Sequence, residues 1–134
     1  MNASRFGISV VAAATMALAI ACGGSSSPST GPSGGCTPSS NANTLVIMNG
    51  TICPQTITVA RGSQLTIQNL DPINHDMNSD PHPEHTDCTE LNQIGNLQTN
   101  QSRISGNLNT ARRCGMHDHI NPDRVSLKAT ITIQ

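Results

Sequence analysis

Apolar and polar residues alternate along three segments of this chain, with the two-residue period of a β-strand that buries one face. The segments are Gln55–Ala60, Ser63–Asn69 and Lys128–Gln134. In the middle segment Leu65 and Ile67 share one face, which predicts that both side chains point into a core. A continuous apolar run at Thr44–Asn49 and the segment Ser102–Leu108, with Ile104 turned inward, predict two further strands.

Turn-forming residues separate these strands, and no stretch of the domain shows a convincing helical period. Residues 71–101 are irregular and rich in Asp, Asn, Pro and His. The chain of 134 residues is long enough for one domain, and it contains no Trp, no Tyr and a single Phe. These features predict an all-β sandwich or barrel with long irregular loops.

The first 21 residues, in which a basic residue precedes the uncharged apolar run Ile8–Ala21, predict a signal peptide for export. The stretch Leu18–Cys22 resembles the processing site of bacterial lipoproteins, which implies that Cys22 is lipidated and becomes the new N-terminus. Residues 22–43 would then form a flexible tether rich in Gly, Ser and Pro, and residues 44–134 the folded domain.

The charge balance and the residue after Cys22 predict the partners and the location of the domain. The chain has seven Lys and Arg residues and eight Asp and Glu residues, so it lacks the basic surface that binding to nucleic acid needs. Contact with a membrane is expected through the lipid anchor only. Gly23, rather than Asp, follows Cys22, which resembles sorting to the outer membrane. We therefore expect a monomeric envelope protein that faces the periplasm.

Histidine and cysteine gather outside the predicted strands. All five histidines fall between positions 75 and 119, namely His75, His82, His85, His117 and His119. The segment Cys114–His119 (CGMHDH) places a thiol and two imidazoles on one predicted loop. A thiolate and two imidazoles from separate parts of a β fold are the donors of a trigonal mononuclear copper centre.

The order of these features resembles the cupredoxin (plastocyanin/azurin-like) family over residues 44–134. The resemblance rests on QTITVARGSQLTIQN at Gln55–Asn69, the following His75, the late Cys114-x-x-His117 and the terminal strand at Thr130–Ile133. The segment around the histidines also looks like a subgroup of bacterial envelope lipoproteins with cupredoxin-like domains. The resemblance implies a Greek-key β-sandwich of the cupredoxin type that binds one copper ion.

The family's ligands carry over onto four positions of this chain. The resemblance implies His75 as the first histidine, Cys114 as the thiolate and His117 as the second histidine, with His119 as its competitor. Leu127 stands where the family's axial Met is expected, so that position lacks a thioether. His82 and His85 are possible rim residues, and either could supply a different donor that makes the site less like a blue-copper centre.

Cysteine parity leaves another interpretation open. After lipidation of Cys22 four cysteines remain, and an even number in an exported protein favours disulfides. The pairs Cys36–Cys53 and Cys88–Cys114 are one of three connectivities. In that arrangement Cys114 would be no ligand, and only an imidazole cluster would remain.

The sequence therefore leaves three functional hypotheses. The leading hypothesis is single-electron transfer with an unidentified redox partner protein, through copper held by His75, Cys114 and His117. The alternatives are non-redox copper binding or sequestration by the histidine-rich loops, and a disulfide-stapled sandwich without metal. No nucleophile elbow or second domain is recognisable, so an enzyme is not expected.

Overall fold

The computed structural model describes residues 35–134, so the predicted signal peptide, Cys22 and most of the predicted tether lie outside the described residues. The strands are β1 (Thr44–Met48), β2 (Thr51–Cys53), β3 (Thr56–Val59), β4 (Thr66–Asn69), β5 (His75–Ser79), β6 (Gly95–Leu97), β7 (Ser102–Ile104), β8 (Arg112–Asp118) and β9 (Ala129–Ile133). Two short 3-10 helices, η1 (Thr89–Gln93) and η2 (Val125–Leu127), lie in the connections. No helix among residues 35–134 is long and apolar enough to cross a membrane.

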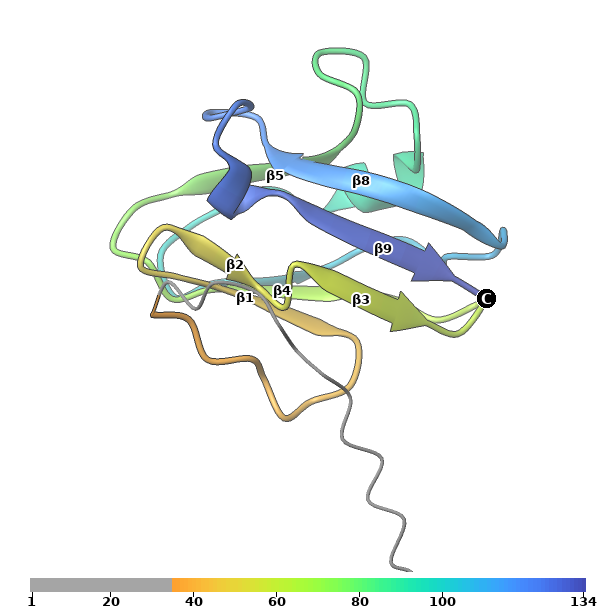
Figure 1. The fold of residues 1–134 in the computed structure, drawn as a ribbon, viewed down its shortest axis with the longest axis horizontal. Helices are drawn as coiled ribbons and strands as arrows, with labels where there is room; N and C mark the ends of the chain where they lie inside the picture. The colour runs from red at the N-terminus through yellow and green to blue at the C-terminus, as the bar shows by residue number, and fades with distance from the viewer. Residues whose placement is uncertain (1–34) are drawn as a thin grey trace, which may run out of the picture.

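The strands form two mixed sheets that enclose one core (Figure 1). One sheet has the order β2-β1-β4-β7 and the other the order β3-β9-β8-β5-β6. The β1–β4 and β3–β9 pairs are parallel, and the remaining pairs are antiparallel. The predicted all-β sandwich with long loops is therefore confirmed.

Branched aliphatic side chains and Met fill the space between the sheets. Leu65 and Ile67 are fully buried, as their shared face predicts, and Met77 and Ile131 meet them from the opposite sheet. The inward placement of Ile104 was wrong, since its side chain is 54% exposed. The cause is the register: Ile104 pairs with Thr66, so its side chain lies on the face of the sheet opposite to the buried Ile67.

Three strands, β5, β6 and β8, lie where the sequence predicted loops or irregular chain. β5 and β8 carry the polar sequences HDMNS and RRCGMHD, and they pair with each other in the middle of the five-stranded sheet. His75 and His117 consequently stand on strands, which corrects the expectation that every histidine lies in a loop. The segment Cys114–Asp118 continues the sheet instead of leaving it.

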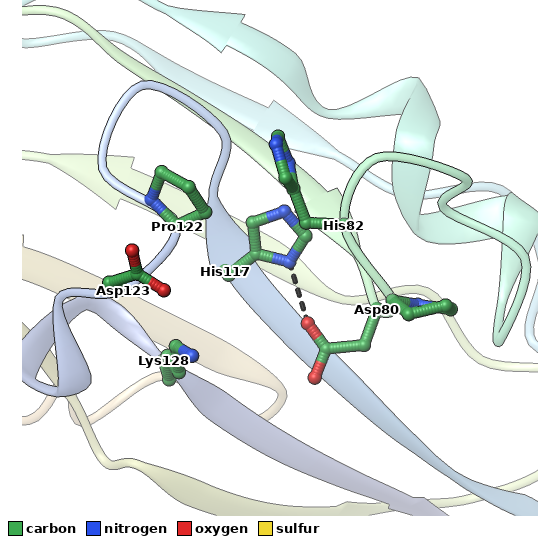
Figure 2. A pocket seen from close by; sticks show the side chains of 7 residues that line it. Asp80, His82, His117, Pro122, Asp123 and Lys128 are labelled. Carbon is green, nitrogen blue, oxygen red and sulfur yellow. Dashed lines mark hydrogen bonds and ion pairs between the residues drawn. The ribbon is translucent and has the colours of Figure 1, made fainter.

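Two disulfides fasten loops to the sheets. Cys36 is bonded to Cys53, with Cα atoms 6.1 Å apart, and Cys88 is bonded to Cys114, with Cα atoms 5.9 Å apart. The second bond ties the loop after β5 to β8, so Asp80 and His82 of that loop lie beside β8 (Figure 2). Of the three connectivities that the cysteine count allows, this is the one named in the sequence analysis.

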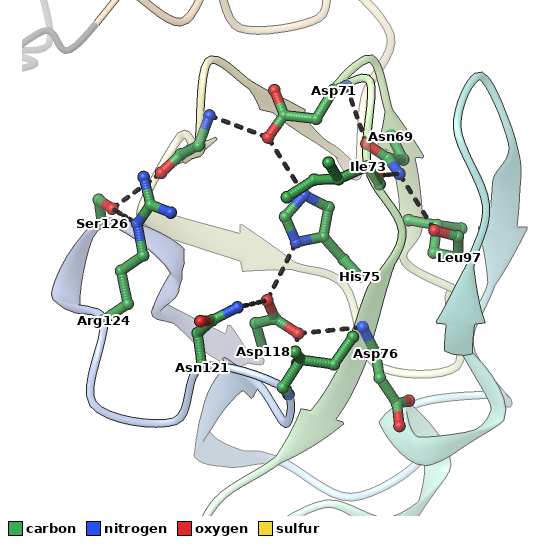
Figure 3. A network of polar contacts seen from close by, with 12 residues as sticks. Asn69, Asp71, Ile73, His75, Asp76, Leu97, Asp118, Asn121, Arg124 and Ser126 are labelled. Atoms are coloured by element: carbon green, nitrogen blue, oxygen red, sulfur yellow. Dashed lines mark hydrogen bonds and ion pairs between the residues drawn. The ribbon is translucent and has the colours of Figure 1, made fainter.

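A buried polar network joins β5 and β8 near the loop after β4 (Figure 3). The two ring nitrogens of His75 lie 3.0 Å from Asp118 Oδ2 and 3.1 Å from Asp71 Oδ2. Asp118 also accepts hydrogen bonds from the Asp76 amide and the Asn121 side chain. Because ionised carboxylates only accept, both bonds of the fully buried His75 ring require an imidazolium.

The charges of this network shift two pKa values in opposite directions. Burial lowers the pKa of His75, but the hydrogen bonds to Asp118 and Asp71 outweigh burial and raise it above 6.5. Burial acts to raise the pKa of Asp118, but the hydrogen bonds from His75 and the Asp76 amide lower it to about 2. The ion pair is therefore intact at mildly acidic pH.

Peptide mapping should recover both disulfides from the non-reduced protein. The expected linked pairs are Cys36 with Cys53 and Cys88 with Cys114, because both Cα separations suit a disulfide. Thiol titration of the denatured, non-reduced protein should find none of these four sulfurs free. Recovery of Cys114 as a free thiol would contradict the structure.

Stability should depend on the charge of His75. A raised folded-state pKa contributes stability that is complete below the unfolded pKa of 6.5 and is lost as pH rises through the folded pKa. His75→Gln should lower the free energy of unfolding by about 3 kcal/mol at pH ~5.5, because two buried carboxylates lose their partner.

The measurement is urea unfolding of wild type and variant in a chelator, at a series of pH values up to about 8.5. The difference between the two proteins should shrink as pH rises, since only the wild type carries the imidazolium. A difference independent of pH would show that His75 is not charged in the folded protein.

Candidate metal centre

Four of the five histidines converge at one end of β8. His82 and His85 lie on the loop after β5, His117 is the penultimate residue of β8, and His119 follows the strand. One ligand atom from each ring lies within 4.8 Å of the ligand atoms of the other three. These four residues are called the histidine cluster below.

Backbone hydrogen bonds hold the loop in place over the strand. The Asp80 amide donates to the Gly115 carbonyl at 3.0 Å, and the Asp87 amide donates to the Asp80 carbonyl at 2.7 Å. His85 adopts a positive φ of 54°, which turns the chain back within the loop. The Asn92 side chain donates to the His85 carbonyl at 2.9 Å and fixes that turn. The two halves of the cluster are thus brought together by the fold before any ligand arrives.

His117 is the buried member of the cluster, with 1% of its surface exposed. Its Nδ1 lies 2.6 Å from Asp80 Oδ1, so it donates its proton to that carboxylate. The other nitrogen, Nε2, is buried and has no hydrogen-bond partner. An unpartnered buried nitrogen is costly, and a metal ion on its lone pair would satisfy it.

The other three rings are more accessible. His119 Nδ1 lies 3.1 Å from His85 Nε2, and the ring centroids of His82 and His119 are 4.7 Å apart. Burial and the neighbouring His117, His119 and His82 lower the pKa of His85. A lowered pKa keeps the imidazole neutral at pH 7, which is the form that binds metal.

A cleft of about 540 Å³ opens beside the cluster. Its lining is Asp80, Pro81, His82, His117, Pro122, Asp123 and Lys128. Figure 2 shows His82 next to His117, and the two rings are nearly perpendicular, with centroids 5.4 Å apart. The cleft connects the cluster to solvent. A metal ion, or a small exogenous ligand of that ion, can therefore approach His82 and His117 from this side.

The histidine cluster fits a transition-metal ion. Four imidazole donors suit copper or zinc, whereas calcium and magnesium require oxygen ligands. Metal–nitrogen bonds of about 2.0–2.1 Å allow opposite donors to be at most ~4.2 Å apart, so the present spread needs only small ring rotations to close. The exposed His82 ring is the freest to make that adjustment.

The predicted thiolate ligand was wrong in this structure. Cys114 is fully buried and bonded to Cys88, so its sulfur is not available to a metal. The His75 assignment also needs correction, because both of its nitrogens are taken by Asp71 and Asp118, outside the cluster. Of the predicted ligands, the structure brings together only His117 and His119.

The structure makes His82 and His85 full members of the cluster, whereas the sequence indicated them as possible rim residues. The signal that pointed to them was spacing: His85 precedes Cys88 by three residues, and His117 follows Cys114 by three. A Cys88–Cys114 bond therefore brings together the two chain segments that carry these rings. Leu127, at the position expected for an axial Met, is fully buried in the core.

No protein-family model matches this sequence, and comparison with curated proteins finds no match. The fold itself has solved counterparts. A mutant plastocyanin of fern is 16% identical with a TM-score of 0.54, and it covers 68% of this chain and 99% of its own.

Two further solved structures have a similar fold. Oxidised plastocyanin from Dryopteris crassirhizoma is 17% identical with a TM-score of 0.54, covering 68% of this chain and 99% of its own. A purple cupredoxin from Nitrosopumilus maritimus is 13% identical with a TM-score of 0.53, covering 70% of this chain and 100% of its own. At such low identity the likeness concerns the fold alone, and the chain has a cupredoxin-like fold.

Proposed function

We propose that this domain binds one copper ion through the imidazoles of His82, His85, His117 and His119. The observation that carries the proposal is the convergence of four ligand nitrogens around a buried, unpartnered His117 Nε2. Bound copper would supply one-electron chemistry or simply be retained. The chain's own contribution is to hold four imidazole nitrogen donors beside a cleft.

Copper is favoured over other metals for two reasons. Affinity of nitrogen sites for divalent metals of the first row peaks at copper, so four imidazoles bind Cu(II) more tightly than Zn(II). In addition, solved structures of similar fold are described as oxidised and reduced plastocyanin and as Cu(I) amicyanin. These descriptions belong to those proteins, and they support copper as the first metal to test here.

The donor set favours metal binding without a blue-copper spectrum. With Cys114 in a disulfide, no thiolate donates to the ion, and the intense thiolate-to-copper absorption is not expected. Retention of copper by the histidine cluster therefore becomes the leading function. Single-electron transfer with an unidentified partner protein is the second candidate, favoured by the exposed His82 ring, which offers a short path from the ion to the surface.

Copper titration should give one tightly bound Cu(II) per chain, with weak visible absorption and nitrogen hyperfine structure in the EPR spectrum. His117→Ala should weaken binding by more than about 100-fold, since it removes the one fixed donor. The matched control is His75→Gln, because His75 is also a buried histidine but lies outside the cluster. It should leave the stoichiometry and spectrum unchanged at a pH where it is folded.

Other outcomes would decide between the candidates. Failure of the wild type to retain any copper would leave the disulfide-stapled sandwich without metal. An intense visible band lost on removal of Cys114 would restore the thiolate site. Voltammetry of the copper-loaded protein distinguishes copper retention from electron transfer. A reversible one-electron wave supports electron transfer, and the absence of a wave supports retention.

We also propose that the domain works as a monomer on the outside of the cytoplasm, tethered through Cys22 to the envelope. Two disulfides in a domain of this size support an oxidising compartment. Cys22→Ala should shift the protein from the membrane fraction to the soluble periplasmic fraction, as measured by fractionation and immunoblot. Persistence of the variant in the membrane fraction would refute the anchor.

A further inference from the structure

We propose that Asp80 is a positioning residue that presents His117 Nε2 to the metal, and that Gly115 is required because its missing side chain makes room for Asp80. This proposal rests on the copper site proposed above. It concerns a carboxylate that does not touch the ion but selects which nitrogen of the buried imidazole is free to do so.

The hydrogen bond between Asp80 and His117 fixes the tautomer of the ring. A carboxylate at 2.6 Å from Nδ1 keeps the proton on that nitrogen, so the lone pair resides on Nε2. Nε2 is the atom that is buried without a partner. In the other tautomer Nε2 would carry a proton and Nδ1 would face the carboxylate with its lone pair, which is unfavourable on both sides.

The backbone aims the Asp80 carboxylate at this position. Asp80 immediately follows β5, and its amide donates to the Gly115 carbonyl of β8 at 3.0 Å. Its own carbonyl accepts from the Asp87 amide at 2.7 Å, which closes the loop. The Asp80 side chain is 39% exposed, so solvent screens its charge, and its effect on the ring is chiefly one of orientation.

Gly115 is the position that Asp80 lies against. A Cβ added to Gly115 would overlap the Asp80 carboxylate, with Cγ at 2.6 Å and Cβ at 2.9 Å. Gly115 lies inside β8 and pairs with Thr130 of β9. The φ of Gly115 is outside the left-handed region, so the backbone at this position would accept alanine. The side chain of Asp80 is therefore what excludes a larger residue at position 115.

Lys128 also lines the cleft, but its side chain does not pair with Asp80. The β8–β9 register, which pairs Met116 with Ala129, places Lys128 opposite His117 at the end of the ladder. Among residues 35–134, Lys128 forms no ion pair and no side-chain hydrogen bond. Asp80 consequently has His117 as its one ionic partner, and the carboxylate is not diverted from the ring.

The test compares two single variants that break the same contact from opposite sides. Asp80→Ala removes the carboxylate, whereas Gly115→Ala leaves it chemically intact but displaces it. Each should weaken Cu(II) binding by about 10- to 100-fold, the usual effect of losing a carboxylate behind a histidine ligand. The double variant should bind no more weakly than Asp80→Ala alone, because both changes break one contact.

Asp87→Ala is the matched control. Asp87 lies on the same loop and its carboxylate accepts from the Gly115 amide at 3.4 Å, but it forms no hydrogen bond or ion pair with His117. Its removal should change copper affinity by less than about twofold. Asp80→Asn keeps an oxygen acceptor for Nδ1–H and should recover most of the affinity lost in Asp80→Ala.

A metal-free measurement separates this proposal from the copper site. Nitrogen-15 NMR of the apoprotein should show His117 protonated at Nδ1 in the wild type and in Asp87→Ala, and shifted toward Nε2–H in Asp80→Ala and Gly115→Ala. Unchanged tautomer and affinity in a folded Asp80→Ala or Gly115→Ala protein would overturn the positioning role. A wild type that binds no copper but shows the expected tautomers would overturn the metal site and leave the Asp80–His117 contact standing.

Discussion

The disulfide between Cys88 and Cys114 holds the loop that carries His82 and His85 against the strand that carries His117. It has two consequences that cannot be separated. It removes the thiolates of Cys88 and Cys114 from coordination chemistry, and it fastens together two segments that are 26 residues apart in the chain. The all-nitrogen character of the histidine cluster and its compactness therefore have one cause.

The length of β8 explains why His75 takes no part in the cluster. The strand continues four residues past Cys114, so the residue at its end, beside His75, is Asp118. The pair Asp118-x-x-Asn121 repeats the spacing that the sequence assigned to Cys114-x-x-His117. A carboxylate and an amide thus stand where a thiolate and an imidazole were expected, and that end of the sandwich is filled by hydrogen bonds (Figure 3).

Sequence alone was sufficient for the parts of the fold that obey a simple period. The strands Thr56–Val59, Thr66–Asn69 and Ala129–Ile133 bury one face against the core, and alternation predicts them. The sequence did not predict β5 and β8, because their polar residues are paired within the structure. His75 pairs with two carboxylates, and His117 pairs with Asp80. Polar side chains that find partners inside a fold look, in a sequence, like residues of a solvated loop.

The gathering of histidines between positions 75 and 119 was also visible in the sequence, but its division into two groups was not. That division depends on how many carboxylates face each ring. His75 has one at each nitrogen, which demands a charged imidazolium and leaves no lone pair for a metal.

His117 has a carboxylate at one nitrogen only, so the same chemistry fixes the proton and frees the opposite lone pair. One additional aspartate thus separates a histidine that stabilises the fold from a histidine suited to hold an ion. Its position is set by the pairing of β5 with β8, which no local pattern in the sequence encodes.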